Sequence, residues 1–446
     1  MFSQYIDNIN IKNLTNSTID ISRKESFEKI KQSNINLYDN ENYKIYNFND
    51  LSNSYSNLID KNTQVNADLN NYFHCQINDL DAYVVVLSNG IYYKENNAKL
   101  NLPDDVIICS IIEAETKHNQ IFKTFYNKQT SLTDDVFSAL NTMFFNDGIF
   151  IYIPNNYKLD KPIQIINITH GFYNKTIFVR NLFVFGKNSE ANILICNHTL
   201  NNSKNFIIDV TETYLDENAT LKYIAIQNEH NQSYVNNFHF VETNKKAHIN
   251  SLELLLNGKF LKNNIFVNLK EEYSSVNLLG LALADKNQIF DNYTYINHKA
   301  SNCCSNELYK YILDDDALGN FNGKIIVAKD AQKTSAQQTN KNICLTDNAK
   351  MKTRPQLEIY ADDVKCSHGT TIGQLDQQAI FYLQQRGISQ KEAQQMLMFA
   401  FANDILLEIK VETLKNKLSE LINSRLKGEL SDCFNCLQSC KTVSNN

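Results

Sequence analysis

Apolar and polar positions follow two different periods along this chain. Between residues 149 and 372, short apolar stretches with period-two alternation are separated by turn residues, a pattern that predicts β-strands. After residue 373, apolar residues recur at i, i+3 and i+4, which predicts amphipathic helices. We therefore expect a long β region followed by a helical region.

The β region contains an internal repeat. A small residue, a spacer and then usually an apolar residue recur with constant spacing at Ala191, Ala219 and Ala247, and in weaker form at Ser275. A fixed period with one strand pair per unit is typical of a solenoid whose coils each bury one face against the next. Because the unit contains only strands, we expect a β-helix; a β-sandwich with accidental spacing is the alternative.

The residues before this region are mixed in character. Residues 22–31 predict a short helix, residues 81–92 a strand, a turn and a second strand, and residues 134–148 a helix that ends at Gly148. The predicted fold is mainly β, with a mixed α/β N-terminal domain, a β-helix core and a C-terminal helical domain. The expected boundaries are 1–133, 134–373 and 374–430, followed by a cysteine-containing tail at 431–446.

Three helices are predicted in the C-terminal domain. The first covers residues 376–385, a capping box from Ser389 to Glu392 opens the second, and the third ends near Gly428. The main apolar stripe of the second helix is Ala393, Met396, Leu397, Ala400, Phe401 and Ile405. Because a small helical unit cannot bury every apolar side chain here, we expect a partner surface. We assign it to Met396, Phe399, Phe401, Ile405 and Leu406.

Composition fits a folded chain of two or three domains. The 446 residues are 43% hydrophobic and 21% charged, and the formal net charge of −6 is spread along the chain. Neither nucleic acid nor an anionic membrane is therefore expected as a partner. No apolar stretch approaches the length of a transmembrane helix, and the first residues lack the features of a secretory signal. A cytoplasmic location is expected.

Ten cysteines are few for a disulfide scaffold of this length, and several lie in clusters that fit metal or redox chemistry. Cys366 and His368 lie two residues apart in the run 354–373. If this run is one continuing strand, both side chains point to the same face. A thiolate and an imidazole are both competent iron–sulfur ligands. The alternative is a buried structural cysteine beside a histidine that bonds the backbone.

Four charged residues surround this pair in the sequence: Glu358, Asp362, Asp363 and Lys365. A carboxylate on the same face as His368 could orient the imidazole or hold its proton. The alternative is a solvated edge without a direct role.

The tail contains a second cysteine cluster. Cys433, Cys436 and Cys440 could hold a cluster or zinc with one outside ligand. The alternative is a disordered tail with free thiols.

The run from Leu357 to Gly373, LEIYADDVKCSHGTTIG, followed by Leu375-Asp376 and FYLQQRGI at 381–388, resembles SufD. SufD proteins are scaffold subunits of the SUF iron–sulfur cluster assembly machinery, in the SufB/SufD family. The resemblance implies a right-handed parallel β-helix. It also matches His368 to the family histidine proposed to form the assembly site with SufB, and Cys366 to a family cysteine.

The resemblance further implies the partners. These are a SufB-like paralogue at the end of the β-helix and a SufC-like ABC ATPase on the C-terminal helices. A transient iron–sulfur cluster would be shared with SufB, and a reduced flavin is implied in the assembled complex, for which no residues stand out here. Since the chain has no phosphate-binding GxxxxGK[ST] loop, ATP hydrolysis is expected in the partner and this chain is expected to be a non-catalytic scaffold.

One departure separates the two scaffold types. SufB carries its key cysteine on a strand upstream of its corresponding histidine, and the equivalent place here, residues 339–342, has none; Cys344 is near but at an apolar position. This favours SufD. The alternatives are a SufB-type scaffold that holds the cluster itself, a carbohydrate-active β-helix enzyme, and a β-solenoid interaction protein without metal chemistry.

Overall fold

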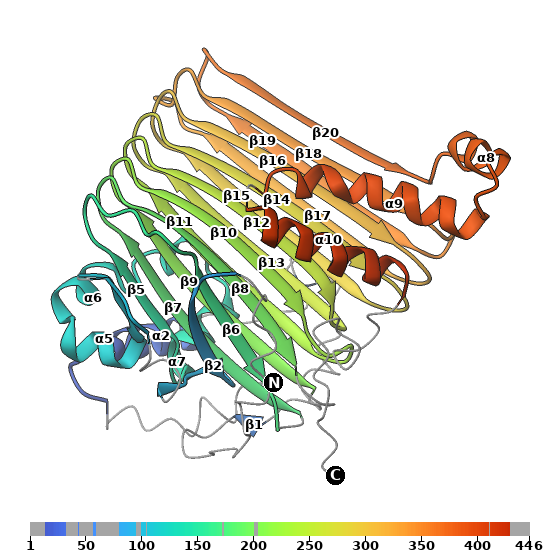
Figure 1. Cartoon of the computed structure of the whole chain (residues 1–446). Helices are drawn as coiled ribbons and strands as arrows, with labels where there is room; N and C mark the ends of the chain where they lie inside the picture. Colours follow the sequence, from blue (N-terminus) through green and yellow to red (C-terminus); the bar gives the residue numbers. More distant parts are fainter. Residues whose placement is uncertain are drawn as a thin grey trace, which may run out of the picture.

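A computed structural model describes most of the chain. The residues described are 14–32, 43, 57–58, 80–94, 100–103, 105–171, 174–199, 204–409 and 411–428. Their dominant feature is a parallel β-solenoid, in which each coil adds one strand to each of two facing sheets (Figure 1). The predicted β-helix core is confirmed.

The first sheet, sheet A, ends at β19 and runs back along the chain to β4. Its strands are β4 (Ile107–Ser110), β5 (Ile149–Ile153), β7 (Lys175–Phe185), β9 (Asn205–Leu215), β11 (Tyr234–Thr243), β13 (Phe260–Leu269), β15 (Ile289–His298), β17 (Leu318–Val327) and β19 (Lys350–Ile359), with β1 (Asn57–Leu58) beside β7. All neighbours are parallel except β4 and β5.

The second sheet, sheet B, ends at β20. Its strands are β2 (Tyr83–Ser88), β3 (Ile91–Tyr92), β6 (Ile163–Thr169), β8 (Glu190–Thr199), β10 (Thr220–Asn228), β12 (His248–Asn257), β14 (Ser275–Ala284), β16 (Cys304–Leu313), β18 (Ser335–Cys344) and β20 (Lys365–Gly373). The predicted strand pair at 81–92 forms as β2 and β3, and β2 pairs with β6 inside this sheet.

The solenoid core lies between the two sheets. In β17, burial alternates residue by residue, and Phe321, Ile325 and Val327 point inward with no exposed surface. Side chains one position away point outward, as the strand period of two requires. One continuous apolar cluster therefore extends from the first coils to the last.

Small residues stack at one corner of successive coils. Ala219, Ala247 and Ser274 are fully buried there, and each follows a residue with positive φ. Cys303 takes the same place one coil later, in contact with the hydroxyl of Ser274 at 3.3 Å. The chain turns in the left-handed conformation at these corners, and only a small side chain fits inside the turn.

The prediction of a strictly constant period is wrong. Leu221 pairs with Ala191 in the coil before it and with Ile249 in the coil after it, and Ile249 pairs with Val276, so the separation in sequence shortens at each step. Inward-facing side chains fix the register of each strand, and the corners absorb the extra or missing residues. Ala191 and Ser275 therefore lie outside the column of small residues at the corner.

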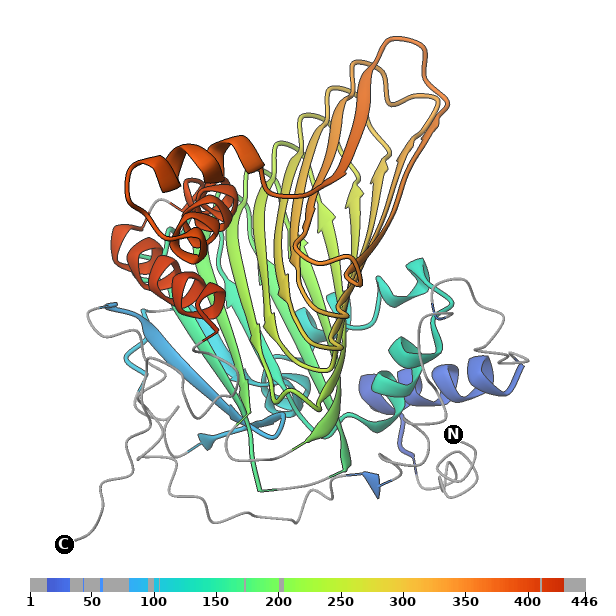
Figure 2. The same cartoon turned by 90° about the vertical axis from the view of Figure 1, so that its right-hand side faces the viewer.

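N-terminal helices cover the outer face of sheet A (Figure 2). They are α2 (Thr18–Gln32), α5 (Ile111–Lys117), α6 (Asn119–Phe125) and α7 (Val136–Phe144), with a 3-10 turn at Thr130–Leu132. α7 stops before Gly148, so the predicted helix end at this glycine is wrong. A Cβ on Gly148 would lie 1.7 Å from the Arg180 carbonyl oxygen, so the glycine permits close packing of two chain segments.

A buried ion pair between two strands of sheet A also holds part of this helical layer in place. Arg180 Nη2 lies 2.6 Å from Glu212 Oε2, and neither side chain has exposed surface. Glu212 also accepts hydrogen bonds from the backbone N–H groups of Asn127 and Gln129. One carboxylate thus neutralises a buried guanidinium and holds the loop between α6 and α7.

The C-terminal helices cover the outer face of sheet B, on the opposite side of the solenoid (Figure 2). They are α8 (Gln377–Gln385), α9 (Gln390–Leu406) and α10 (Glu412–Leu426), and the predicted capping box at Ser389 and Glu392 is present. Of the described helices, none combines the length and the apolar character needed to cross a bilayer.

The inward face of α9 differs from the predicted stripe. Its buried residues are Ala393, Met398, Ala402, Ile405 and Leu406, whereas Met396 is half exposed. α9 carries apolar side chains around most of its circumference, so periodicity alone did not identify the packed face. Polar contacts add to this packing, since Lys310 pairs with Asp404 and Arg425 with Asp285.

We expect Glu212→Ala to lower the free energy of unfolding by about 3–5 kcal/mol, because it leaves the Arg180 guanidinium buried without a counter-charge. Glu217 is the matched control. Its ion pair with Lys187 is exposed and 3.4 Å long, so Glu217→Ala should cost at most about 1 kcal/mol. Urea unfolding followed by circular dichroism compares the two variants, and equal losses would contradict the role given to the buried pair.

Candidate functional site

The run 354–373 forms two strands and not one. Ile359 ends β19 in sheet A, a turn follows at 360–364, and Lys365 begins β20 in sheet B. The turn is pinned to the preceding coil, because the Lys333 N–H donates to the Asp363 carbonyl at 2.6 Å and the Asp363 N–H donates to Gln332 Oε1 at 2.9 Å. The run is therefore not one continuing strand, but Cys366 and His368 both lie on β20 and share a face.

We call residues 350–373, which comprise β19, β20 and the turn between them, the terminal coil. Both of its strands lie at the end of their sheets (Figure 1). Each pairs with an earlier strand on one side only, so backbone groups on the other side have no strand partner among the described residues. Exposed strand edges of this kind favour association with another chain.

Cys366 and His368 lie on the inward face of the terminal coil. In the pairing of β20 with β18, Cys366 is opposite Ala336 and His368 is opposite Gln338, and both of these β18 residues are buried. Cys366 packs against the apolar core and is half-buried, and this burial raises the pKa of its thiol. His368 is exposed because no further coil covers it.

The opposite wall of this end comes from β19. Thr370 Oγ1, on the same inward face as His368, lies 3.3 Å from Thr353 Oγ1 across the interior. Around this polar centre lie exposed apolar side chains: Ile359 is 41%, Tyr360 63% and Ile372 53% exposed. The end of the solenoid thus combines an accessible imidazole, open strand edges and an apolar margin.

The four charged neighbours predicted around the pair do not share its face. Glu358 occupies an outward position of β19 and pairs with Lys324 at 2.7 Å. Asp362 and Asp363 lie in the turn, and Lys365 occupies an outward position at the start of β20. Because two strands and a corner replace the single strand, none of the four lies beside His368 on the inward face.

Sequence reasoning missed the polar interior behind His368. Gln338 Nε2 donates to Glu307 Oε2 at 2.6 Å, and Asn342 Nδ2 donates to Asn340 Oδ1 at 2.7 Å; all four side chains are buried. Burial raises the pKa of the Glu307 carboxyl to about 7. Only the pairing register between coils places these residues behind the imidazole, and a strictly constant period does not give it.

Of the candidate metal ligands, Cys366 and His368 lie in the described part of the chain and the tail cysteines do not. In the described part of the chain, no group of three or more His, Cys, Asp or Glu side chains could hold a metal ion. Cys366 and His368 therefore do not form a complete site on their own. The tail cysteines Cys433, Cys436 and Cys440 lie outside the described residues.

The predicted partner surface on α9 is only partly accessible. Ile405 and Leu406 have no exposed surface because they pack on sheet B, so their assignment to a partner surface is wrong for this arrangement. Phe399 and Phe401 are partly buried, and Phe401 lies against the Lys310 ammonium, whereas Met396 is 50% exposed.

Two aromatic residues outside the predicted set are more exposed. Phe381 is 61% and Tyr382 58% exposed, and both lie on α8, which projects beyond the end of β20 (Figure 1). They are part of the FYL sequence that carries the resemblance, so the sequence does contain a signal for them.

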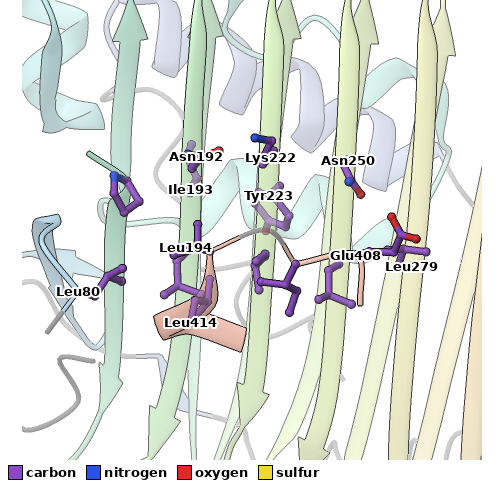
Figure 3. Close-up of a pocket in the computed structure, with 15 residues that line it drawn as sticks. Leu80, Asn192, Ile193, Leu194, Lys222, Tyr223, Asn250, Leu279, Glu408 and Leu414 are labelled. Atoms are coloured by element: carbon purple, nitrogen blue, oxygen red, sulfur yellow. The ribbon is translucent and has the colours of Figure 1, made fainter. Parts of the chain in front are cut away.

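An apolar pocket lies between sheet B and the connection from α9 to α10 (Figure 3). Leu194, Leu279 and Leu414 line it, and Lys222 and Glu408 are its charged members. It is remote in sequence and in the sheet from β20, so it does not belong to the site around His368.

Comparison with known proteins supports the resemblance. The family model for the SUF system FeS cluster assembly, SufBD core domain, matches residues 167–401, and that for the SufBD protein N-terminal region matches residues 1–165. The iron–sulfur cluster assembly protein SufD of Escherichia coli is 34% identical over 301 residues, which cover 66% of this chain and 70% of that protein.

Two further relatives agree. An iron–sulfur cluster assembly SufBD family protein of Synechocystis is 30% identical over 76% of this chain and 77% of its own length. SufD of Bacillus subtilis is 23% identical over 72% of this chain and 74% of its own length. The chain therefore belongs to the SufBD family and is a SufD-like protein of the SUF system of iron–sulfur cluster assembly.

Proposed function

We propose that this chain is a non-catalytic cytoplasmic scaffold that assembles iron–sulfur clusters together with a SufB-like paralogue and a SufC-like ABC ATPase. The observation that carries the proposal is the terminal coil, where both sheets end and an exposed His368 faces the open interior. The cluster is the cargo of this site, shared transiently with the paralogue.

His368 is the ligand that this chain would supply first. Its imidazole is accessible, and an imidazole in place of a thiolate alters the properties of an iron–sulfur cluster. Cys366 comes second, because a raised thiol pKa disfavours the thiolate, which is the form that binds metal. Since one histidine is an incomplete ligand set, the remaining ligands would come from the paralogue.

The paralogue would dock on the terminal coil. Free strand edges can pair with strands of another chain, and pairing would also remove Ile359, Tyr360 and Ile372 from water. The same contact would place the partner's ligands next to His368. Docking at this end thus completes the site and protects the open edge in one step.

The ATPase would dock on α8 and the neighbouring part of α9. Phe381, Tyr382 and Met396 are exposed there, and aromatic side chains dominate the energy of many protein interfaces. ATP hydrolysis would occur in that partner.

We expect His368→Ala to abolish cluster maturation in cells that depend on this chain, because the accessible ligand is removed. His248 is the matched control, since it is also exposed but lies on β12, and His248→Ala should leave maturation intact. Maturation is measured as the activity of a reporter iron–sulfur enzyme. Normal maturation in the His368→Ala variant would exclude the proposed role of His368 in cluster assembly. A stable cluster after anaerobic reconstitution of the isolated chain would instead favour a SufB-type scaffold.

The double change Ile359→Lys and Ile372→Lys should prevent binding of the SufB-like paralogue, because it places two charges in a contact that is expected to become dry. Ile21→Lys is the control, since Ile21 is 44% exposed on α2, in the helical layer over sheet A. Size-exclusion chromatography of the mixed proteins reads the outcome. A complex of unchanged stability would exclude the terminal coil as the docking surface.

Replacing Phe381 and Tyr382 by serine should weaken binding of the SufC-like ATPase by at least about 2 kcal/mol, the usual cost of losing an aromatic hot spot. Leu407→Ser is the control, because Leu407 is 54% exposed but lies at the far end of α9. Isothermal titration calorimetry measures both affinities. Equal affinities for wild-type chain and double variant would place the ATPase elsewhere.

A further inference from the structure

Three inward-facing residues of sheet B form a column that ends at His368. Glu307 of β16 pairs with Gln338 of β18, and Gln338 pairs with His368 of β20. Neighbouring strands lie about 4.8 Å apart, so side chains at paired inward positions are in contact range. Glu307 and Gln338 are 0% and 1% exposed, while His368 lies at the open end.

Two contacts position the amide nitrogen of Gln338. Nε2 donates to Glu307 Oε2 at 2.6 Å. Gly323 of β17, in the facing sheet, packs against the same nitrogen, because a Cβ there would come within 2.2 Å of Nε2 and 2.8 Å of Cδ. Gly323 therefore leaves the space that this amide occupies. With Nε2 bonded to Glu307, Oε1 lies on the side of the amide away from that carboxyl.

The amide oxygen of Gln338 has no such contact in the described part of the chain. Gln338 Oε1 is buried and has no hydrogen-bond partner among the described residues. Nearby donors are in use, since Asn340 Nδ2 donates to the Tyr309 carbonyl and Thr370 Oγ1 lies against Thr353 Oγ1. A buried acceptor without a donor is unfavourable. The paired residue on the side away from Glu307 is His368.

We propose that Gln338 is a positioning residue for His368, whose ring N–H donates to Gln338 Oε1 once a partner covers the terminal coil. The bond selects one tautomer and leaves the lone pair of the other ring nitrogen free to bind iron. A neutral amide does this without placing a charge beside the cluster. The inference rests on the proposed role of His368 and extends it to residues that hold the ring.

The test uses the full chain, labelled with ¹⁵N in its histidine rings, in complex with the unlabelled SufB-like paralogue and without a cluster. We expect one His368 ring nitrogen to be protonated and protected from exchange. Gln338→Met keeps a similar volume but lacks the acceptor, so the His368 signals should shift to the averaged values of exchanging tautomers. Maturation should fall by about 10–100-fold, the usual effect of losing a residue that orients a ligand.

Gln337→Met is the matched control. Gln337 precedes Gln338 on β18 but is exposed on the outward face, so its replacement should change neither the His368 signals nor maturation. Gly323→Ala fills the space of the amide and should reproduce the effect of Gln338→Met. Identical His368 signals in wild-type and Gln338→Met complexes overturn the inference. If Gln338→Met does not fold, the wild-type complex alone provides the test. Averaged signals from the two His368 ring nitrogens in that complex would overturn the inference.

The failures of the two proposals are distinguishable. If His368→Ala leaves maturation intact, the cluster role fails whatever the ring signals show. If His368→Ala abolishes maturation while Gln338→Met changes neither the signals nor maturation, the cluster role stands and only the positioning role of Gln338 fails.

Discussion

Parallel, in-register hydrogen bonding between successive coils is the constraint on which the rest of the structure depends. Each strand must match the inward face of the strand before it, because a shift of one residue would turn every apolar side chain outward. Like positions therefore stack into columns, such as the small residues at the corner that includes Ala247 and Cys303. The same rule produces the column from Glu307 to His368.

A stack of parallel coils leaves the outer edges of its last coil without strand partners from the same stack. Each strand from β5 to β18 has a neighbour on both sides, but β19 and β20 each have one neighbour among the described strands. The last coil is consequently the place where inward-facing residues become accessible without any loop or cleft. His368 owes its exposure to this position, whereas Gln338, with the same orientation one coil earlier, is buried.

Local features of the fold could be predicted from the sequence, and the pairing between coils could not. The capping box at Ser389 and the strands near residue 85 depend on neighbours in the chain, and they were found. Register depends on how many residues each corner holds, which varies from coil to coil. Ala361 illustrates the difficulty, because it is buried in the core although it lies in a turn. The apolar alternation therefore continues through the corner, and the sequence pattern does not reveal that the strand ends there.

The two helical layers are attached to the solenoid by different polar contacts. Over sheet A, the buried Glu212 carboxylate accepts hydrogen bonds from the backbone N–H groups of Asn127 and Gln129, so separation of the helical layer would break hydrogen bonds to a charged group. Over sheet B, Arg425 of α10 bonds Asp285 and two carbonyl oxygens. α9 is held to the sheet by Lys310, whose partner Asp404 remains 56% exposed.

Burial lowers the pKa of the Lys310 ammonium, which shows that burial is unfavourable for its charged form. If α9 moved away, Lys310 would regain hydration, and this would offset part of the free energy lost with the ion pair to Asp404. Polar attachment therefore weakens from α10 to α9, towards the end of the layer that carries α8. The aromatic side chains proposed to receive the ATPase lie on α8, at the end of the helical layer where this polar attachment is weaker.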